Sequence, residues 1–163
     1  MVVFPALFWG ALLLSATEPW PLSLRQGPDT AHARQGYERL FGFAPDASLS
    51  SLYFYSFNVR DASYYVRFRF DDAAVIDEIV QARDLVEAPD SARRDTRFDL
   101  RASSDHLSWW PPETINAAES LFVDRRTGEK IAGAIPWNSP IGFSRLLWVD
   151  ERNGLAFYRE IEF

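Results

Sequence analysis

The sequence contains few residues that could perform nucleophilic, acid–base or metal chemistry, and they are widely spaced. His32 and His106 are the only histidines, and neither has a partner at metal-ligand spacing. The chain has no cysteine, which excludes disulfides, thiol catalysis and cysteine-ligated metals. It also has no Gly-x-Ser-x-Gly motif and no glycine-rich phosphate loop. We therefore expect no catalytic residue, no bound metal and no cofactor.

Aromatic rings and carboxylates occur together between Trp109 and Glu119. Glu113 follows Trp109 and Trp110 closely, and Glu119 comes at the end of the same stretch. Two carboxylates beside aromatic faces are the residues that glycoside hydrolysis uses. A glycan-acting hydrolase is therefore one alternative. In the other interpretation the rings pack the loop onto a sheet and both glutamates are solvated.

The two adjacent tryptophans also suggest a binding surface. In extended backbone the rings of Trp109 and Trp110 point to opposite sides, and two prolines stiffen the chain directly after them. This pattern predicts that one ring is a buried anchor and that the other is at least partly exposed for recognition. Our candidate binding residues are Trp109, Trp110, Trp137 and Glu113.

A predicted β-hairpin and the helix after it form the centre of the chain. Leu52–Val59 and Tyr64–Phe70 are rich in aromatic and β-branched residues, as half-buried strands require. If residues 60–63 form the loop, Tyr55 faces Phe68, and nearly every large apolar side chain lies on one face. Residues 71–72 then begin an amphipathic helix that we expect to continue to Pro89 and to lie across this face. Its apolar stripe is Val75, Ile76, Ile79, Val80 and Ala82.

An earlier helix is predicted by its capping signals. Asp29 or Thr30 can cap its first turn, apolar residues recur at helical spacing up to Phe41, and Gly42 suits its C-terminal end. The polar, mixed-charge stretch from Glu87 to His106 predicts a long surface loop.

The last third of the chain contains an internal echo. Leu121–Gly128 and Leu147–Gly154 share leucine, an aromatic residue, valine, aspartate, arginine and glycine in place. An aspartate leaving a strand can hold a turn, and glycine accepts a positive φ. The echo therefore predicts two hairpins, pairing about 120–124 with 129–133 and about 145–150 with 155–162. Calcium binding is disfavoured because each turn has only one well-placed carboxylate.

Composition sets the fold class. The 163 residues are 47% hydrophobic and 15% aromatic, enough for one globular domain. The fold class that we predict is α+β, an antiparallel sheet of two or three β-hairpins with helices packed on one face.

The net charge of −6 argues against binding to a nucleic-acid backbone. The expected domains are a signal peptide or membrane anchor at 1–17, a linker at 18–28 and a single domain at 29–163.

The first residues indicate export. Val2–Ala16 has no charged side chain and is shorter than the ~20 residues that span a bilayer, so it suits a signal peptide or an uncleaved anchor. A buried N-terminal segment and a misassigned start are the alternatives. We expect an exported, periplasmic or membrane-anchored protein that faces outside the cytoplasm and contacts the membrane through residues 2–16.

Several stretches resemble small exported bacterial proteins. They are residues 41–45, residues 61–70, Trp109 to Pro111, and residues 147–154 with Tyr158. This resemblance assigns no site residue. We predict a non-enzymatic binding domain with a possible protein partner. The alternatives are an inhibitor or immunity protein for a basic partner, and the glycan-acting hydrolase.

Overall fold

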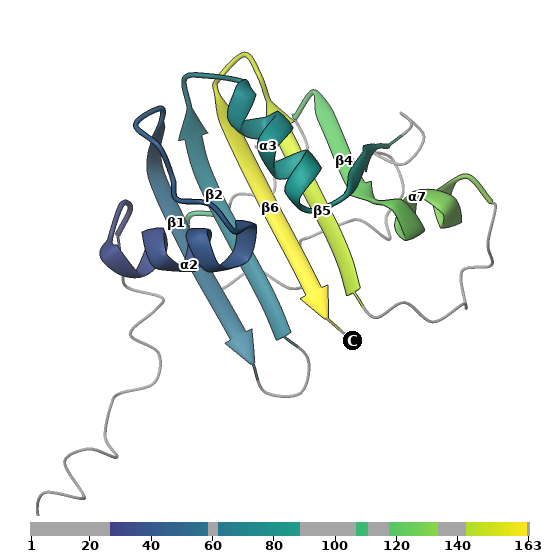
Figure 1. Ribbon diagram of the computed structural model, residues 1–163, viewed down its shortest axis with the longest axis horizontal. Coiled ribbons are helices and arrows are strands. Elements are labelled where there is room, and N and C mark those ends of the chain that lie inside the picture. The colour runs from purple at the N-terminus through teal and green to yellow at the C-terminus, as the bar shows by residue number, and fades with distance from the viewer. Residues whose placement is uncertain (1–26, 59–61, 89–106, 111–117, 134–142, 163) are drawn as a thin grey trace, which may run out of the picture.

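The computed structural model describes residues 27–58, 62–88, 107–110, 118–133 and 143–162. Within these residues, one six-stranded sheet has the order β1-β2-β6-β5-β4-β3, and every neighbouring pair is antiparallel (Figure 1). The strands are β1 (Leu49–Asn58), β2 (Ala62–Phe70), β3 (Leu85–Glu87), β4 (Ser120–Asp124), β5 (Phe143–Asp150) and β6 (Leu155–Glu162). The helices are α2 (Ala31–Phe41), α3 (Ala74–Ala82) and α7 (Arg125–Ile131). The predicted α+β class with an antiparallel sheet is confirmed.

Helix α2 begins and ends where its sequence predicts. The Oγ1 of Thr30 accepts a hydrogen bond from the backbone N of Ala33 at 3.1 Å, which caps the first turn. Gly42 follows the helix with a φ of 84°. Asp29 joins the helix to β1 instead of capping it. Its backbone N donates to the carbonyl of Leu52 at 2.8 Å, and its carboxylate accepts from the backbone N of Ser51 and of Leu52 at 3.0 and 3.1 Å.

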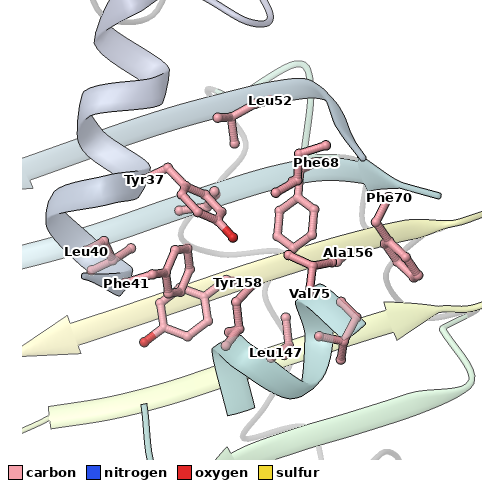
Figure 2. Packing of buried hydrophobic residues seen from close by; sticks show 14 of the residues in the cluster. Tyr37, Leu40, Phe41, Leu52, Phe68, Phe70, Val75, Leu147, Ala156 and Tyr158 are labelled. Carbon is pink, nitrogen blue, oxygen red and sulfur yellow. The ribbon is translucent and has the colours of Figure 1, made fainter. Parts of the chain in front are cut away.

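One hydrophobic cluster joins α2 and α3 to the sheet. Figure 2 shows Tyr37 and Phe41 of α2 pointing toward Phe68 of β2 and Tyr158 of β6. The ring centroids of Phe41 and Tyr158 are 4.9 Å apart, in an edge-to-face arrangement that aromatic pairs favour. Val75 of α3 belongs to the same cluster. Helix α7 contacts β3 and β4 at the other end of the sheet (Figure 1), so the packing of all helices on one face stays a prediction.

A second hydrophobic cluster covers the opposite face of the sheet. Along β6, Tyr158 belongs to the first cluster and Phe157 to the second, and successive strand residues point to opposite faces. The second cluster includes Tyr55, Tyr65, Trp109, Trp110, Leu146 and Trp148. The sheet is therefore buried on both faces.

The register of the first hairpin differs from the prediction because of this double burial. Tyr55 pairs with Tyr65 instead of Phe68, and Phe54 pairs with Val66. Phe54 consequently joins the helix-side cluster and Tyr55 the opposite one. The prediction that nearly every large apolar side chain of the hairpin lies on one face is wrong, since both faces of β1 have an apolar layer to pack against.

The region after α3 also differs from the prediction. Val75, Ile76 and Ile79 are buried as expected, and Asp72 Oδ1 accepts from the backbone N of Ala74 at 2.9 Å. The helix ends at Ala82, however, well before Pro89, and the chain turns through Asp84 with a φ of 50°. It then forms β3, a short strand that pairs with β4, where the prediction had the helix continue.

The two halves of the echo fold differently. Residues 155–162 return beside β5 as predicted, and the β5–β6 pairing is confirmed. The predicted hairpin of 120–124 with 129–133 is wrong, because Asp124 caps helix α7 over Arg125–Ile131. Among the residues that the structure describes, no helix is long and apolar enough to cross a membrane. Residues 1–26 and 89–106 lie outside that part of the chain.

Candidate functional site: a buried glutamate between two arginines

Glu160 is the most deeply buried carboxylate of the described residues, with 0% of its surface exposed. It lies on β6 and faces the helix side, two residues after Tyr158. Its Oε1 accepts from Nε of Arg145 at 2.8 Å, and its Oε2 accepts from the hydroxyl of Tyr158 at 2.8 Å. Oε2 also accepts from Nη2 of Arg83. Burying a charge is costly unless it is paired and hydrogen-bonded, and Glu160 meets both conditions.

Arg83 connects three elements to this carboxylate. It follows the last residue of α3, where the helix end directs its side chain over β6. Its Nη1 donates to the carbonyl of Leu40 in α2 at 3.0 Å, and its Nε donates to the hydroxyl of Tyr158 at 3.2 Å. Burial alone lowers the pKa of Arg83, but Tyr158 and Glu160 outweigh it and raise that pKa above its ordinary value. Arg83 therefore remains a cation.

Arg145 reaches Glu160 from the neighbouring strand. The two residues are directly opposite each other in the β5–β6 ladder. The backbone N of Arg145 donates to Oδ2 of Asp124 at 3.0 Å, which ties the start of β5 to the cap of α7. Its Nη1 donates to the carbonyl of Arg83 at 3.5 Å. A single carboxylate thus holds two guanidinium groups from different parts of the chain.

The arrangement suits positioning rather than acid–base chemistry. Both oxygens of Glu160 are occupied, and none of its surface is exposed, so it has no access to a substrate proton. Burial and the nearby Glu160 carboxylate raise the pKa of Tyr158, which keeps its hydroxyl protonated as a donor. The side chains of Arg83 and Arg145 are each 19% exposed. What reaches solvent is therefore the pair of oriented arginines.

Each arginine lines a separate cavity. Arg83 contributes to a cavity of about 220 Å³ beside α2. The other lining residues are Gly36, Arg39, Leu40, Phe54, Ser56, Tyr64 and Glu162. Arg145 contributes to a cavity of about 260 Å³ beside α7. Its other lining residues are Asp84, Asp124, Arg125, Arg126 and Glu129. Both cavities contain charges of both signs.

The predicted tryptophan site has a different geometry from the one expected. Trp109 and Trp110 are only 9% and 1% exposed, so the prediction that one ring is exposed is wrong. The reason is a turn, in which the backbone N of Trp110 donates to the carbonyl of Leu107 at 2.9 Å. In a turn, adjacent side chains need not alternate, and both rings pack on the same face. Trp109 stacks on Tyr53 with centroids 5.2 Å apart.

Two of the four predicted binding residues, Trp137 and Glu113, lie outside the described residues. Of the four, the structure brings together Trp109 and Trp110. A binding role for the four residues stays a prediction. The structure adds Arg83, Arg145 and Glu160, which sequence analysis missed. The available signal was weak: a charged residue two positions after Tyr158, on the same face of β6 as Ala156 and Tyr158.

The described residues contain no group of three or more histidine, aspartate or glutamate side chains arranged to hold a metal ion. Comparison of the chain with protein-family models, with curated proteins and with solved structures found no match.

Proposed function

We propose that this chain is a non-enzymatic binding domain, exported or held at a membrane through residues 2–16, whose partner is a protein. The observation that carries the proposal is the pair of arginines fixed by one buried glutamate, each at the wall of a small cavity. Side chains held in place before binding lose little entropy when a partner covers them.

The size of the cavities favours a protein partner. At about 220 and 260 Å³ they are smaller than the ~300–1,000 Å³ of most small-molecule sites. They fit single side chains of a partner, as the anchor pockets of protein interfaces do. Since both cavities contain charges of both signs, the matching surface presents charged groups of both signs.

Burying the charged groups of the Glu160 cluster costs free energy of folding, and a binding role gives a reason for that cost. Well-packed apolar residues in place of a buried ion pair are often equally stabilising or more so. Stability alone therefore does not explain why this chain has a cluster of one carboxylate, two guanidiniums and a tyrosine hydroxyl. Its proposed role is to fix the direction of Arg83 and Arg145.

A matched pair of variants on α2 tests the proposal. Arg39 lines the cavity beside α2, whereas Arg34 lies on the same helix outside it. The tagged full-length chain is used to capture proteins from detergent-solubilised membranes of its own source. We expect Arg39→Gln to weaken binding of the captured partner about tenfold, because it removes one charge-assisted hydrogen bond. Arg34→Gln should leave the binding unchanged.

A second variant addresses the other cavity. Arg126→Gln changes the cavity beside α7, and we expect a loss of similar size. If no protein is retained, or if the Arg34, Arg39 and Arg126 variants all retain it equally, the proposal is wrong.

Fractionation of the full-length protein tests its location, because a chain recovered only in the cytosol would contradict export and anchoring.

A further inference from the structure

A second pair of arginines lies on the face of the sheet opposite Glu160. Arg67 belongs to β2 and Arg159 to β6. In the ladder between these strands, Tyr65 pairs with Arg159 and Phe157 pairs with Arg67. Directly paired residues share a face, and so do residues two apart on a strand, so the two arginines are diagonal neighbours on one face.

Arg159 is a deeply buried cation. It is 8% exposed, and its Nε has no hydrogen-bond partner. Burial lowers the pKa of Arg159 below its ordinary value, while Tyr65 raises it in part. A buried guanidinium with an unused donor is costly, since most buried polar groups are hydrogen-bonded.

Arg67 also has an unused donor, and its guanidinium lies among aromatic rings. Its Nε also has no hydrogen-bond partner, and its Nη1 donates to the carbonyl of Trp109 at 3.4 Å. The Cζ of Arg67 is 5.4 Å from the ring centroid of Tyr53 and 6.0 Å from that of Phe157. Burial lowers the pKa of Arg67, Tyr53 raises it in part, and the positive charge of Arg69 lowers it again.

The described residues provide these two arginines with no carboxylate. Five other arginines make the ion pairs within that part of the chain: Arg34, Arg83, Arg125, Arg145 and Arg152. The contrast with the Glu160 face is direct. There, one carboxylate compensates two guanidiniums, whereas here two arginines occupy diagonal positions of the ladder among tyrosine, tryptophan and phenylalanine rings.

We propose that Arg67 and Arg159 form a binding site for the carboxylate or phosphate group of a small molecule. Both groups match the planar donor geometry of guanidinium, and each arginine has an Nε donor with no hydrogen-bond partner. Because Arg159 is only 8% exposed, the ligand is a small molecule rather than a protein surface. The rings of Tyr53, Trp109 and Phe157 favour a ligand with an apolar or aromatic body.

Thermal unfolding of the purified full-length protein tests this site. Sodium benzoate, sodium acetate and sodium phosphate are each compared with sodium chloride at equal ionic strength. We expect at least one oxyanion to raise Tm, by about 5–10 °C when its concentration reaches a hundred times Kd. A larger shift with benzoate than with acetate or phosphate identifies an aromatic carboxylate, and a larger shift with phosphate identifies a phosphate ligand.

Three variants on the same face link the shift to these side chains. Arg159→Met and Arg67→Met should each abolish the oxyanion shift. Arg69→Met is the matched control on β2, since Arg69 is exposed and bonds the carbonyl of Asn153, and it should keep the full shift. Without oxyanion, Arg159→Met should not lower Tm by more than Arg69→Met, because it removes a buried charge that the described residues do not compensate.

Three results would overturn the proposal. The first is the absence of any shift beyond that of sodium chloride with all three oxyanions. The second is a shift that survives in both Arg67→Met and Arg159→Met. The third is a large loss of Tm in Arg159→Met without oxyanion, which would show that the guanidinium of Arg159 is paired within the protein.

Discussion

Asp124 and Asp150 end neighbouring antiparallel strands with nearly the same sequence around them, yet a helix follows one and a tight turn follows the other. Both aspartates are buried, and each binds the third residue after it in the same way. Oδ1 accepts from the backbone N of Thr127 or Asn153, at 2.9 and 3.1 Å. Oδ2 accepts from the side chain of the same residue, at 2.7 Å in both cases.

The difference begins at the glycine. Gly154 has a φ of 54° and reverses the chain into β6, whereas Gly128 lies inside α7. After Gly128 come Glu129 and Lys130, which favour helix, and after Gly154 comes an apolar run that favours a strand. The comparison shows that the aspartate determines only the first turn, and that the residues beyond the glycine decide what the turn becomes.

The substitution with the largest expected effect is Gly154→Ala. The positive φ disfavours alanine, and a Cβ at this position would clash with the carbonyl oxygen of Phe70. We expect the free energy of unfolding to fall by about 2–4 kcal/mol in chemical denaturation. A loss below about 0.5 kcal/mol would show that the turn does not need this backbone conformation.

Asp124→Ala should come next. The carboxylate is 2% exposed and accepts three hydrogen bonds, two from Thr127 and one from the backbone N of Arg145. Leaving these donors unpaired should cost about 2–3 kcal/mol in urea unfolding. Asp124→Asn keeps an acceptor oxygen and should lose less. Equal losses in the two variants would mean that the charge, and not the hydrogen bonds, matters.

Asp150→Ala should have a smaller effect than Asp124→Ala. Its carboxylate accepts two hydrogen bonds, both from Asn153, whose side chain is exposed and can bind water instead. We expect a loss of about 1–2 kcal/mol, measured under the same conditions. A larger loss than for Asp124→Ala would reverse our ranking of the two turns.

Gly128→Ala should have the smallest effect and is the matched control for Gly154→Ala. Alanine favours the helix by about 1 kcal/mol, but its Cβ would lie 3.0 Å from Cγ2 of Val86. The two effects oppose each other, so the free energy of unfolding should change by less than about 1 kcal/mol. If both alanine variants destabilise equally, the two glycines have the same role and the comparison fails.

Local signals predicted the parts of the fold that depend on local chemistry. The cap at Thr30, the glycine at Gly42 and the β5–β6 hairpin all appear as expected. The register of the first hairpin could not be predicted, because it depends on an apolar layer contributed by Trp109 and Trp148, far away in the sequence. Helix α7 could not be predicted because its first residues have the same motif as the turn between β5 and β6.

The candidate site was beyond sequence analysis for a physical reason. Arg83, Arg145 and Glu160 come from three separate elements, and only the pairing of β5 with β6 and the end of α3 bring them together. The aromatic pair was recognisable from the sequence, but its exposure was not. A single hydrogen bond between Leu107 and Trp110 directs both rings to the same face.

The position of Asp29 bears on what the edge of the sheet offers to another molecule. Strand β1 is an edge of the sheet, and an edge strand offers backbone groups to which another molecule can add a strand. Asp29 already occupies three such groups, the N–H of Ser51 and both the N–H and the carbonyl of Leu52. Its charge would also be buried by any incoming strand. This one residue therefore leaves fewer backbone groups at the start of β1 for a strand of another molecule to bind.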